Sequence, residues 1–154
     1  MASIDWAYLF NGFHGRIGRQ TFWIGMIVLT AIELVFHFVA EQIQGDRLSA
    51  IVDLLFTYPQ FAIATKRCHD RDMPIWLLIV FFVGNAVLDL FDVLGVSGTP
   101  DEPSMLVIAI SVPFMVLLVV LVIELGFRRG TPGPNRYGPD PLAPPAAPAA
   151  PGQS

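Results

Sequence analysis

The sequence predicts an all-α integral membrane protein with four transmembrane helices and both termini in the cytoplasm. Three observations lead to this fold class: four long apolar runs, a low charged fraction, and basic residues that alternate in number between the runs. Of the 154 residues, 54% are hydrophobic and only 14% are charged, whereas a soluble domain is usually about one quarter charged. A soluble bundle of four buried helices is the alternative, but too little polar surface remains to cover it.

The apolar runs have the length of membrane spans. A helix rises about 1.5 Å per residue, so about 20 residues cross a hydrocarbon core of roughly 30 Å. Because the backbone must satisfy its own hydrogen bonds in lipid, we expect each run to be a helix. The second run is the weakest, because it contains Asp53 and Pro59. The four expected spans are approximately residues 22–39, 48–65, 74–91 and 105–127.

The basic residues set the orientation. If the runs cross the membrane alternately, eight of the nine Lys and Arg residues fall on one side and only Arg47 falls on the other. The positive-inside rule then places both termini in the cytoplasm. The first run is longer than the core of a secretory signal, so we expect it to remain as a span.

Two flanking segments complete the organisation. Trp6, Leu9, Phe10 and Phe13 recur at helical spacing and predict a short interfacial helix before the first span. The last 14 residues, 141–154, form a Pro/Ala-rich tail that we expect to be disordered. The expected division is therefore a membrane domain over residues 1–140 and a tail over 141–154.

A block of mixed charge, KRCHDRDMP at residues 66–74, interrupts the apolar sequence. We expect it to form a short cytoplasmic turn between the second and third spans. Arginine and carboxylate form planar, bidentate pairs, and the candidate carboxylates on the same side are Asp70, Asp72, Glu124 and Asp140. The expected structure is a polar cap on the inner ends of the helices, or alternatively a headgroup or anion site built from the same arginines. The polar cap is defined as Arg16, Arg19, Arg67, Asp70, Arg71 and Arg136.

Catalytic and metal sites are not indicated. Cys68, His69 and Asp70 are adjacent, so their side chains point in different directions in any regular structure. A metal site would need Cys68 and His69 with a distant ligand such as His14, and no paired ligand spacing is present. We therefore expect no enzyme activity, no cofactor and no metal. The net charge of −4 gives no reason to expect nucleic-acid binding.

Polar residues also lie within the expected spans. The mid-helix polar set is defined as Glu33, His37, Asp53 and Asp89. Glu33 and His37 are four residues apart and share a helix face, where they can hydrogen-bond each other. One interpretation is that the set bonds neighbouring helices or faces the outer headgroups. The other is that it marks an ion or proton pathway, because acids inside the membrane are costly.

Three sequence blocks carry a family resemblance. They are NGFHGRIGRQTFW at residues 11–23, YPQFAIATKRCHD at residues 58–70 and RRGTPGPNRYGPDP at residues 128–141. The chain resembles the DUF805 family, the YhaH-like small bacterial inner-membrane proteins of unknown function. Lys66 and Cys68 depart from the family pattern, which leads us to expect Arg and Leu. The resemblance implies a multi-pass protein of the bacterial inner membrane and supplies no reaction.

Two functions therefore remain open. The first is a non-enzymatic structural, accessory or sensing component that works through the polar cap. The alternative is a small oligomeric transporter or channel subunit that moves a cation or proton by means of the mid-helix polar set. The expected partners are the lipid bilayer and either a second copy of the chain or another membrane protein.

Overall fold

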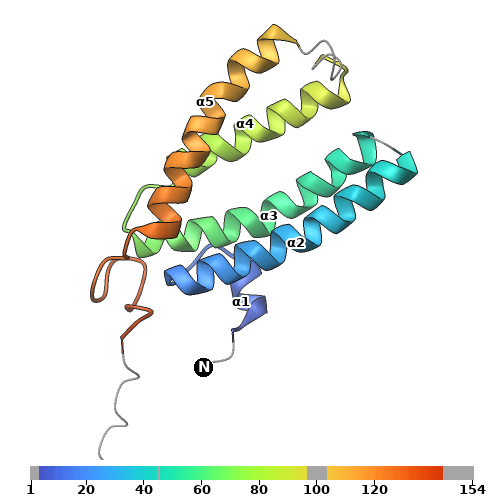
Figure 1. Ribbon diagram of the computed structural model, residues 1–154. Helices are drawn as coiled ribbons and strands as arrows, with labels where there is room; N and C mark the ends of the chain where they lie inside the picture. Colours follow the sequence, from blue (N-terminus) through green and yellow to red (C-terminus); the bar gives the residue numbers. More distant parts are fainter. Residues whose placement is uncertain (1–3, 45, 97–103, 144–154) are drawn as a thin grey trace, which may run out of the picture.

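The computed structural model describes residues 4–44, 46–96 and 104–143, and within these ranges the chain is helical and has no strand. Figure 1 shows two helical hairpins, α2–α3 and α4–α5, with the short helix α1 beside them. The all-α class is thus confirmed for the described residues, while residues 144–154 of the expected tail lie outside them. In chain order the elements are α1 (Trp6–Phe10), α2 (Arg19–Gln44), α3 (Asp46–Asp70), α4 (Trp76–Val93), α5 (Met105–Leu121) and its π-helical continuation η1 (Val122–Phe127).

The two hairpins converge at one end of the molecule and diverge toward the other (Figure 1). α2 packs along α3, α4 packs on α3, and η1 returns to both α2 and α3. The buried apolar core lies at the converging end and includes Leu9, Phe22, Ile63 and Leu125. Away from this end the helices expose large apolar side chains, as the 68% exposure of Leu55 illustrates. Such continuous apolar surface is typical of a protein covered by lipid.

The helix lengths refine the expected spans. Three described helices are long and apolar enough to cross a membrane: Arg19–Ile43, Leu48–Asp70 and Met105–Phe127. The third expected span corresponds to a shorter apolar helix, Trp76–Phe91. The second run is of full length, with Pro59 inside α3, and it is the least apolar of the three long helices. The third run is the shortest of the four. That the chain crosses the membrane four times, with both termini in the cytoplasm, remains a prediction.

The prediction that residues 66–74 form a turn is wrong for the first half of that block. α3 continues to Asp70, and its end is closed by hydrogen bonds from Asp72 N to His69 O and from Met73 N to Cys68 O. Asp72 adopts the left-handed conformation with φ of 53° that this C-terminal motif requires. Lys66 and Arg67 have 0% exposure. They tolerate burial because carbonyl oxygens of distant segments accept their hydrogen bonds.

The predicted short helix near the N-terminus is present as α1, but it ends at Phe10, so Phe13 lies beyond it. Asp5 caps it, because its Oδ1 accepts a hydrogen bond of 2.9 Å from Tyr8 N. Gly12, with φ of 67°, then allows the chain to leave the helix direction and run back toward α2. Leu9 is buried in the core, whereas Trp6 is exposed. The helix is therefore anchored on α3, and its contact with lipid remains a prediction.

Candidate functional site

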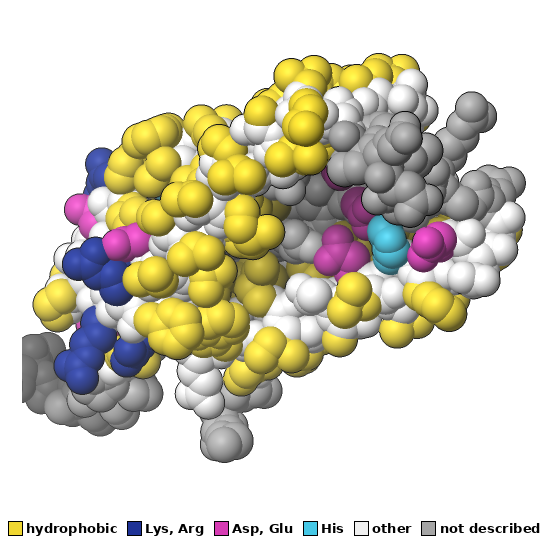
Figure 2. Space-filling view, turned by 45° about the horizontal axis from the view of Figure 1, so that its top comes forward, with side chains coloured by type: hydrophobic (Ala, Val, Ile, Leu, Met, Phe, Trp, Pro, Cys, Tyr) yellow, Lys and Arg dark blue, Asp and Glu magenta, His cyan; other side chains and the backbone are white. Residues whose placement is uncertain are grey.

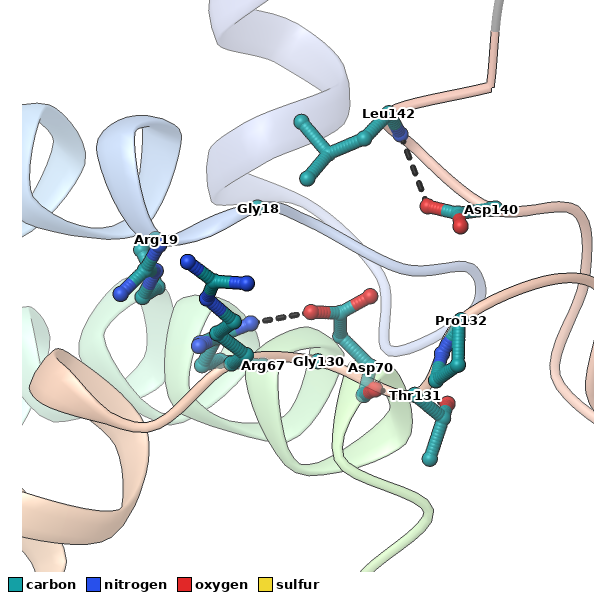
Figure 3. A pocket seen from close by; sticks show the side chains of 10 residues that line it. Gly18, Arg19, Arg67, Asp70, Gly130, Thr131, Pro132, Asp140 and Leu142 are labelled. Atoms are coloured by element: carbon teal, nitrogen blue, oxygen red, sulfur yellow. Dashed lines mark hydrogen bonds and ion pairs between the residues drawn. The ribbon is translucent and has the colours of Figure 1, made fainter.

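The polar cap lies at the converging end of the hairpins, where Figure 2 shows Lys and Arg side chains gathered. Asp70, in the last turn of α3, is its centre. Arg16 donates to Asp70 Oδ1 from Nε at 3.1 Å and from Nη2 at 3.0 Å. Arg67 donates to the other oxygen, Oδ2 (Figure 3). All three side chains are at most 4% exposed, so one carboxylate compensates two buried guanidinium groups.

Most other hydrogen bonds of the two arginines go to backbone carbonyl oxygens near the C-terminal end. Arg16 Nη1 donates to Gly133 O at 2.7 Å and Arg16 Nη2 to Thr131 O at 2.7 Å. Arg67 Nε donates to Leu125 O, also at 2.7 Å. Buried polar groups are costly unless they are hydrogen-bonded. The two arginines therefore join three segments far apart in sequence: the chain before α2, the end of α3, and the chain after α5.

The segment after η1 closes over Asp70 through its own backbone. Thr131 N donates to Asp70 O at 2.8 Å, and Asn135 Nδ2 donates to His69 O at 2.9 Å. The ring of Tyr137 stacks on His69 with 3.8 Å between ring centroids. Gly130 passes so close to the Asp70 carboxylate that a Cβ atom at this position would overlap it. This segment is thus fixed by contacts that a larger residue at position 130 would disturb.

Lys66 is a further member of the site that its sequence context did not predict. Its ammonium donates to Leu9 O at 3.0 Å, Asn11 O at 3.0 Å and Gly12 O at 2.8 Å. These carbonyl oxygens lie at the C-terminal end of α1, where a cation is favoured. Lys66 therefore holds α1 on α3. The Gly-rich sequence after α1 is the feature that could have predicted this role, because a bend there leaves carbonyl groups without helical hydrogen-bond partners.

The outer ring of the cap makes more exposed pairs. Arg71 contacts Glu124 at 2.8 Å, and Arg136 contacts Asp72 at 2.8 Å with both side chains largely exposed. Arg128, four residues after Glu124, also pairs with that carboxylate.

Two candidate members of the cap make other contacts. Arg19 donates to Phe127 O at 3.1 Å and has no ion pair among the described residues. Asp140 accepts from Gly133 N and Leu142 N, both at 2.9 Å, instead of pairing with arginine. These two N–H groups lower the pKa of the Asp140 carboxyl below its ordinary value.

The mid-helix polar set lies toward the diverging end, where Figure 2 shows acidic side chains and a histidine together. Glu33 and His37 do not bond each other, because both turn toward α3. Gln60 Nε2 donates to Glu33 Oε2 at 2.6 Å, and His37 Nδ1 lies 3.0 Å from Asp53 Oδ1. Asp89 lines a cavity of 380 Å³ between α3 and α4. The structure thus brings three of the four residues together, while Asp89 lies on α4 at the cavity between α3 and α4.

The Cys–His–Asp sequence forms no reactive arrangement in the described chain. Cys68 is buried in the apolar core, while His69 is covered by Tyr137 and Asp70 is held by two arginines. Among the residues that the structure describes, no group of three or more His, Cys, Asp or Glu side chains is placed to hold a metal ion.

Comparison with known proteins identifies the family. The family model described as "Protein of unknown function (DUF805)" matches residues 10–139. The chain belongs to the DUF805 family. No solved structure matches it.

Three relatives in Escherichia coli (strain K12) are similar over most of their lengths. Inner membrane protein YhaH is 26% identical, with 90% of this chain and 97% of the relative covered. Uncharacterized protein YiiR is 29% identical, with 86% and 87% covered. Inner membrane protein YhaI is 29% identical, with 84% and 86% covered. The predicted membership of an inner-membrane family is thus confirmed, and the DUF805 match includes every residue of the polar cap and of the mid-helix polar set.

Proposed function

We propose that this DUF805-family protein is a non-enzymatic, multi-pass protein of the bacterial inner membrane with four spans and both termini in the cytoplasm. It acts as a structural, accessory or sensing component through the face that the polar cap forms. Support for the orientation comes from charge: eight of the nine Lys and Arg residues belong to segments at the polar-cap end, and Arg47 lies at the α2–α3 connection. By the positive-inside rule that end is cytoplasmic.

The observation that carries the proposal is the closed hydrogen bonding of Arg16, Arg67 and Asp70. These three side chains are paired with one another and with backbone carbonyl oxygens of three chain segments, so they offer no unpaired group to a substrate. The result is a rigid platform surrounded by exposed arginines, among them Arg128, Arg129 and Arg136. Exposed charges on a rigid scaffold favour recognition of a partner through electrostatic complementarity.

Partner capture tests this proposal. The protein is crosslinked in native membranes, purified in mild detergent, and its partners are identified by mass spectrometry. We expect a reproducible partner protein that is lost with Arg136→Ala, because this arginine is exposed and its removal leaves the buried centre intact. His14→Ala, another exposed position at the same end, is the matched control and should retain the partner. Crosslinks between copies of this chain alone, at fixed stoichiometry, would contradict the accessory role.

A second candidate function rests on the mid-helix polar set. Glu33, His37 and Asp53 are only half-buried and lie where the hairpins diverge, so an oligomer could use them as a path for a cation or proton. Purified protein in liposomes tests this with a pH-sensitive dye and an imposed ion gradient. Flux that is lost in Glu33→Gln with Asp89→Asn, at unchanged assembly, would favour transport. Absence of flux from the unaltered protein would eliminate it.

A further inference from the structure

A groove at the edge of the polar cap combines a charged half and an apolar half. The charged half is a cavity of 260 Å³ whose lining includes Arg19, Arg67, Arg129 and Thr131 (Figure 3). The apolar half is a cavity of 500 Å³ whose lining includes Trp23, Phe127 and Leu142. Both cavities are lined by Gly18, Arg19 and Leu142, so they are two parts of one groove between the start of α2 and the C-terminal segment.

The charged half favours an anion. Three arginines line it against two aspartates, Asp70 and Asp140. The Asp70 carboxylate is already bound by Arg16 and Arg67, and that of Asp140 by two backbone N–H groups. The Asp70 charge is compensated by these two arginines, while Asp140 stays ionised, so three lining arginines and Arg16 outweigh two carboxylates.

Arginine donors remain available at the rim of the charged half. Arg129 is exposed, and within the described chain its guanidinium has no hydrogen-bond partner. Arg19 uses only Nη1 within the same ranges, for Phe127 O. Arg67 at the floor has all its nitrogens bonded, so it contributes positive charge but no free donor. Two guanidinium groups can thus donate to the oxygens of one phosphate.

The apolar half distinguishes a lipid from a soluble anion. Trp23 is fixed there because its Nε1 donates to Gly126 O at 3.0 Å, and its ring packs edge-on against Phe127 with centroids 5.6 Å apart. Phe127 is 64% exposed and Leu142 is 82% exposed. A soluble phosphate gains nothing from this apolar surface. A phospholipid places its phosphate against arginine and its first acyl methylenes against such side chains.

We propose that this groove binds an anionic phospholipid, with Arg19 and Arg129 donating to the phosphodiester and the acyl chains leaving past Trp23 and Phe127. The site requires insertion of α2 and α5 in the bilayer. It does not depend on the accessory role proposed above, nor on which leaflet the polar cap faces.

Quenching of Trp23 by brominated lipid tests the proposal. Trp6→Phe with Trp76→Phe leaves Trp23 as the single tryptophan, and both replaced side chains are exposed. This protein is reconstituted in vesicles of phosphatidylcholine that contain an increasing fraction of acyl-brominated phosphatidylglycerol, or of acyl-brominated phosphatidylcholine. We expect half-maximal quenching at a lower mole fraction of the anionic lipid.

Two variants with equal charge loss locate the site. Arg19→Gln with Arg129→Gln should weaken the preference for phosphatidylglycerol by roughly fivefold for each arginine removed. Arg128→Gln with Arg136→Gln removes two arginines outside the groove and should retain the preference. Circular dichroism and Trp23 emission in pure phosphatidylcholine verify that each variant is folded.

Three results would overturn the inference. The first is an unchanged preference in the groove variant. The second is an equal loss in both variants, which would indicate general surface attraction. The third is relief of quenching by millimolar glycerol phosphate, which would assign the charged half to a soluble phosphate ester. A failed partner capture leaves this quenching result unaffected, so the two proposals can fail separately.

Discussion

Two polar regions of this molecule contain similar ionisable side chains but differ in burial. At the centre of the polar cap, Arg16, Arg67 and Asp70 are at most 4% exposed and these three charges are paired with one another. In the mid-helix polar set, the side chains of His37 and Asp53 are 41% and 31% exposed although they lie 3.0 Å apart. Burial makes removal of one partner costly, whereas exposure lets solvent replace the pair. From this difference we expect that loss of a partner at the centre of the polar cap destabilises the fold more than loss of one in the mid-helix polar set.

The largest expected effect is that of Asp70→Asn. It leaves two buried arginines without a negative charge and should lower the free energy of unfolding by about 3–5 kcal/mol. Thermal unfolding in mild detergent, followed by circular dichroism, measures the loss. Asp72→Asn is the matched control, because Asp72 is exposed and its removal affects only the surface pair with Arg136. Equal melting of Asp70→Asn and the unaltered protein would contradict a structural polar cap.

A smaller and more local effect is expected for Lys66→Met. Three carbonyl oxygens near the end of α1 lose their buried donor, at a cost of about 1–3 kcal/mol. Hydrogen exchange with mass spectrometry should show faster exchange of residues 6–12 and little change in α4. Uniform acceleration over all helices would show instead that α1 is not a separate unit anchored by Lys66.

His37→Ala tests the effect of the mid-helix polar set on the free energy of unfolding. Because the pair with Asp53 is partly exposed, the free energy of unfolding should fall by less than about 1 kcal/mol. The same thermal unfolding assay as for Asp70→Asn allows a direct ratio of the two effects. A loss as large as that of Asp70→Asn would mean that the mid-helix polar set is also structural.

The smallest effect concerns Asp140. Hydrogen bonds from Leu142 N and Gly133 N favour its ionised form, so its pKa lies below the ordinary value. The stabilisation is therefore complete above the ordinary carboxyl pKa and is lost as the pH falls through the lowered pKa. Carboxyl chemical shifts in an NMR titration measure that midpoint directly. A midpoint at the ordinary value would show that the two hydrogen bonds do not persist in solution.

Much of the fold follows from the sequence because lipid imposes simple requirements. Apolar runs predict the helices, but the charged block at residues 66–74 predicts a turn, whereas α3 continues to Asp70. The burial of Lys66 and Arg67 could not be predicted in this way. It depends on carbonyl oxygens of Leu9 and Leu125, which only the tertiary structure brings to the end of α3. A run of charged residues normally indicates exposure to solvent. Here backbone carbonyl oxygens accept the hydrogen bonds that water would otherwise accept.

The buried cluster of Arg16, Arg67 and Asp70 also has a consequence for the biosynthesis of the protein. Residue 70 leaves the ribosome long before Leu125, Arg128 and Thr131, whose carbonyl oxygens accept from Arg67 and Arg16. During translation the α2–α3 hairpin and the segment before it therefore carry Arg67 and Arg16 before the carbonyl oxygens that accept their hydrogen bonds have been made. A chain released before residue 131 would keep these arginines incompletely bonded, whatever the quality of its apolar helices. The buried arginines of this cluster therefore obtain their full set of hydrogen-bond acceptors only when the segment after α5 has been made.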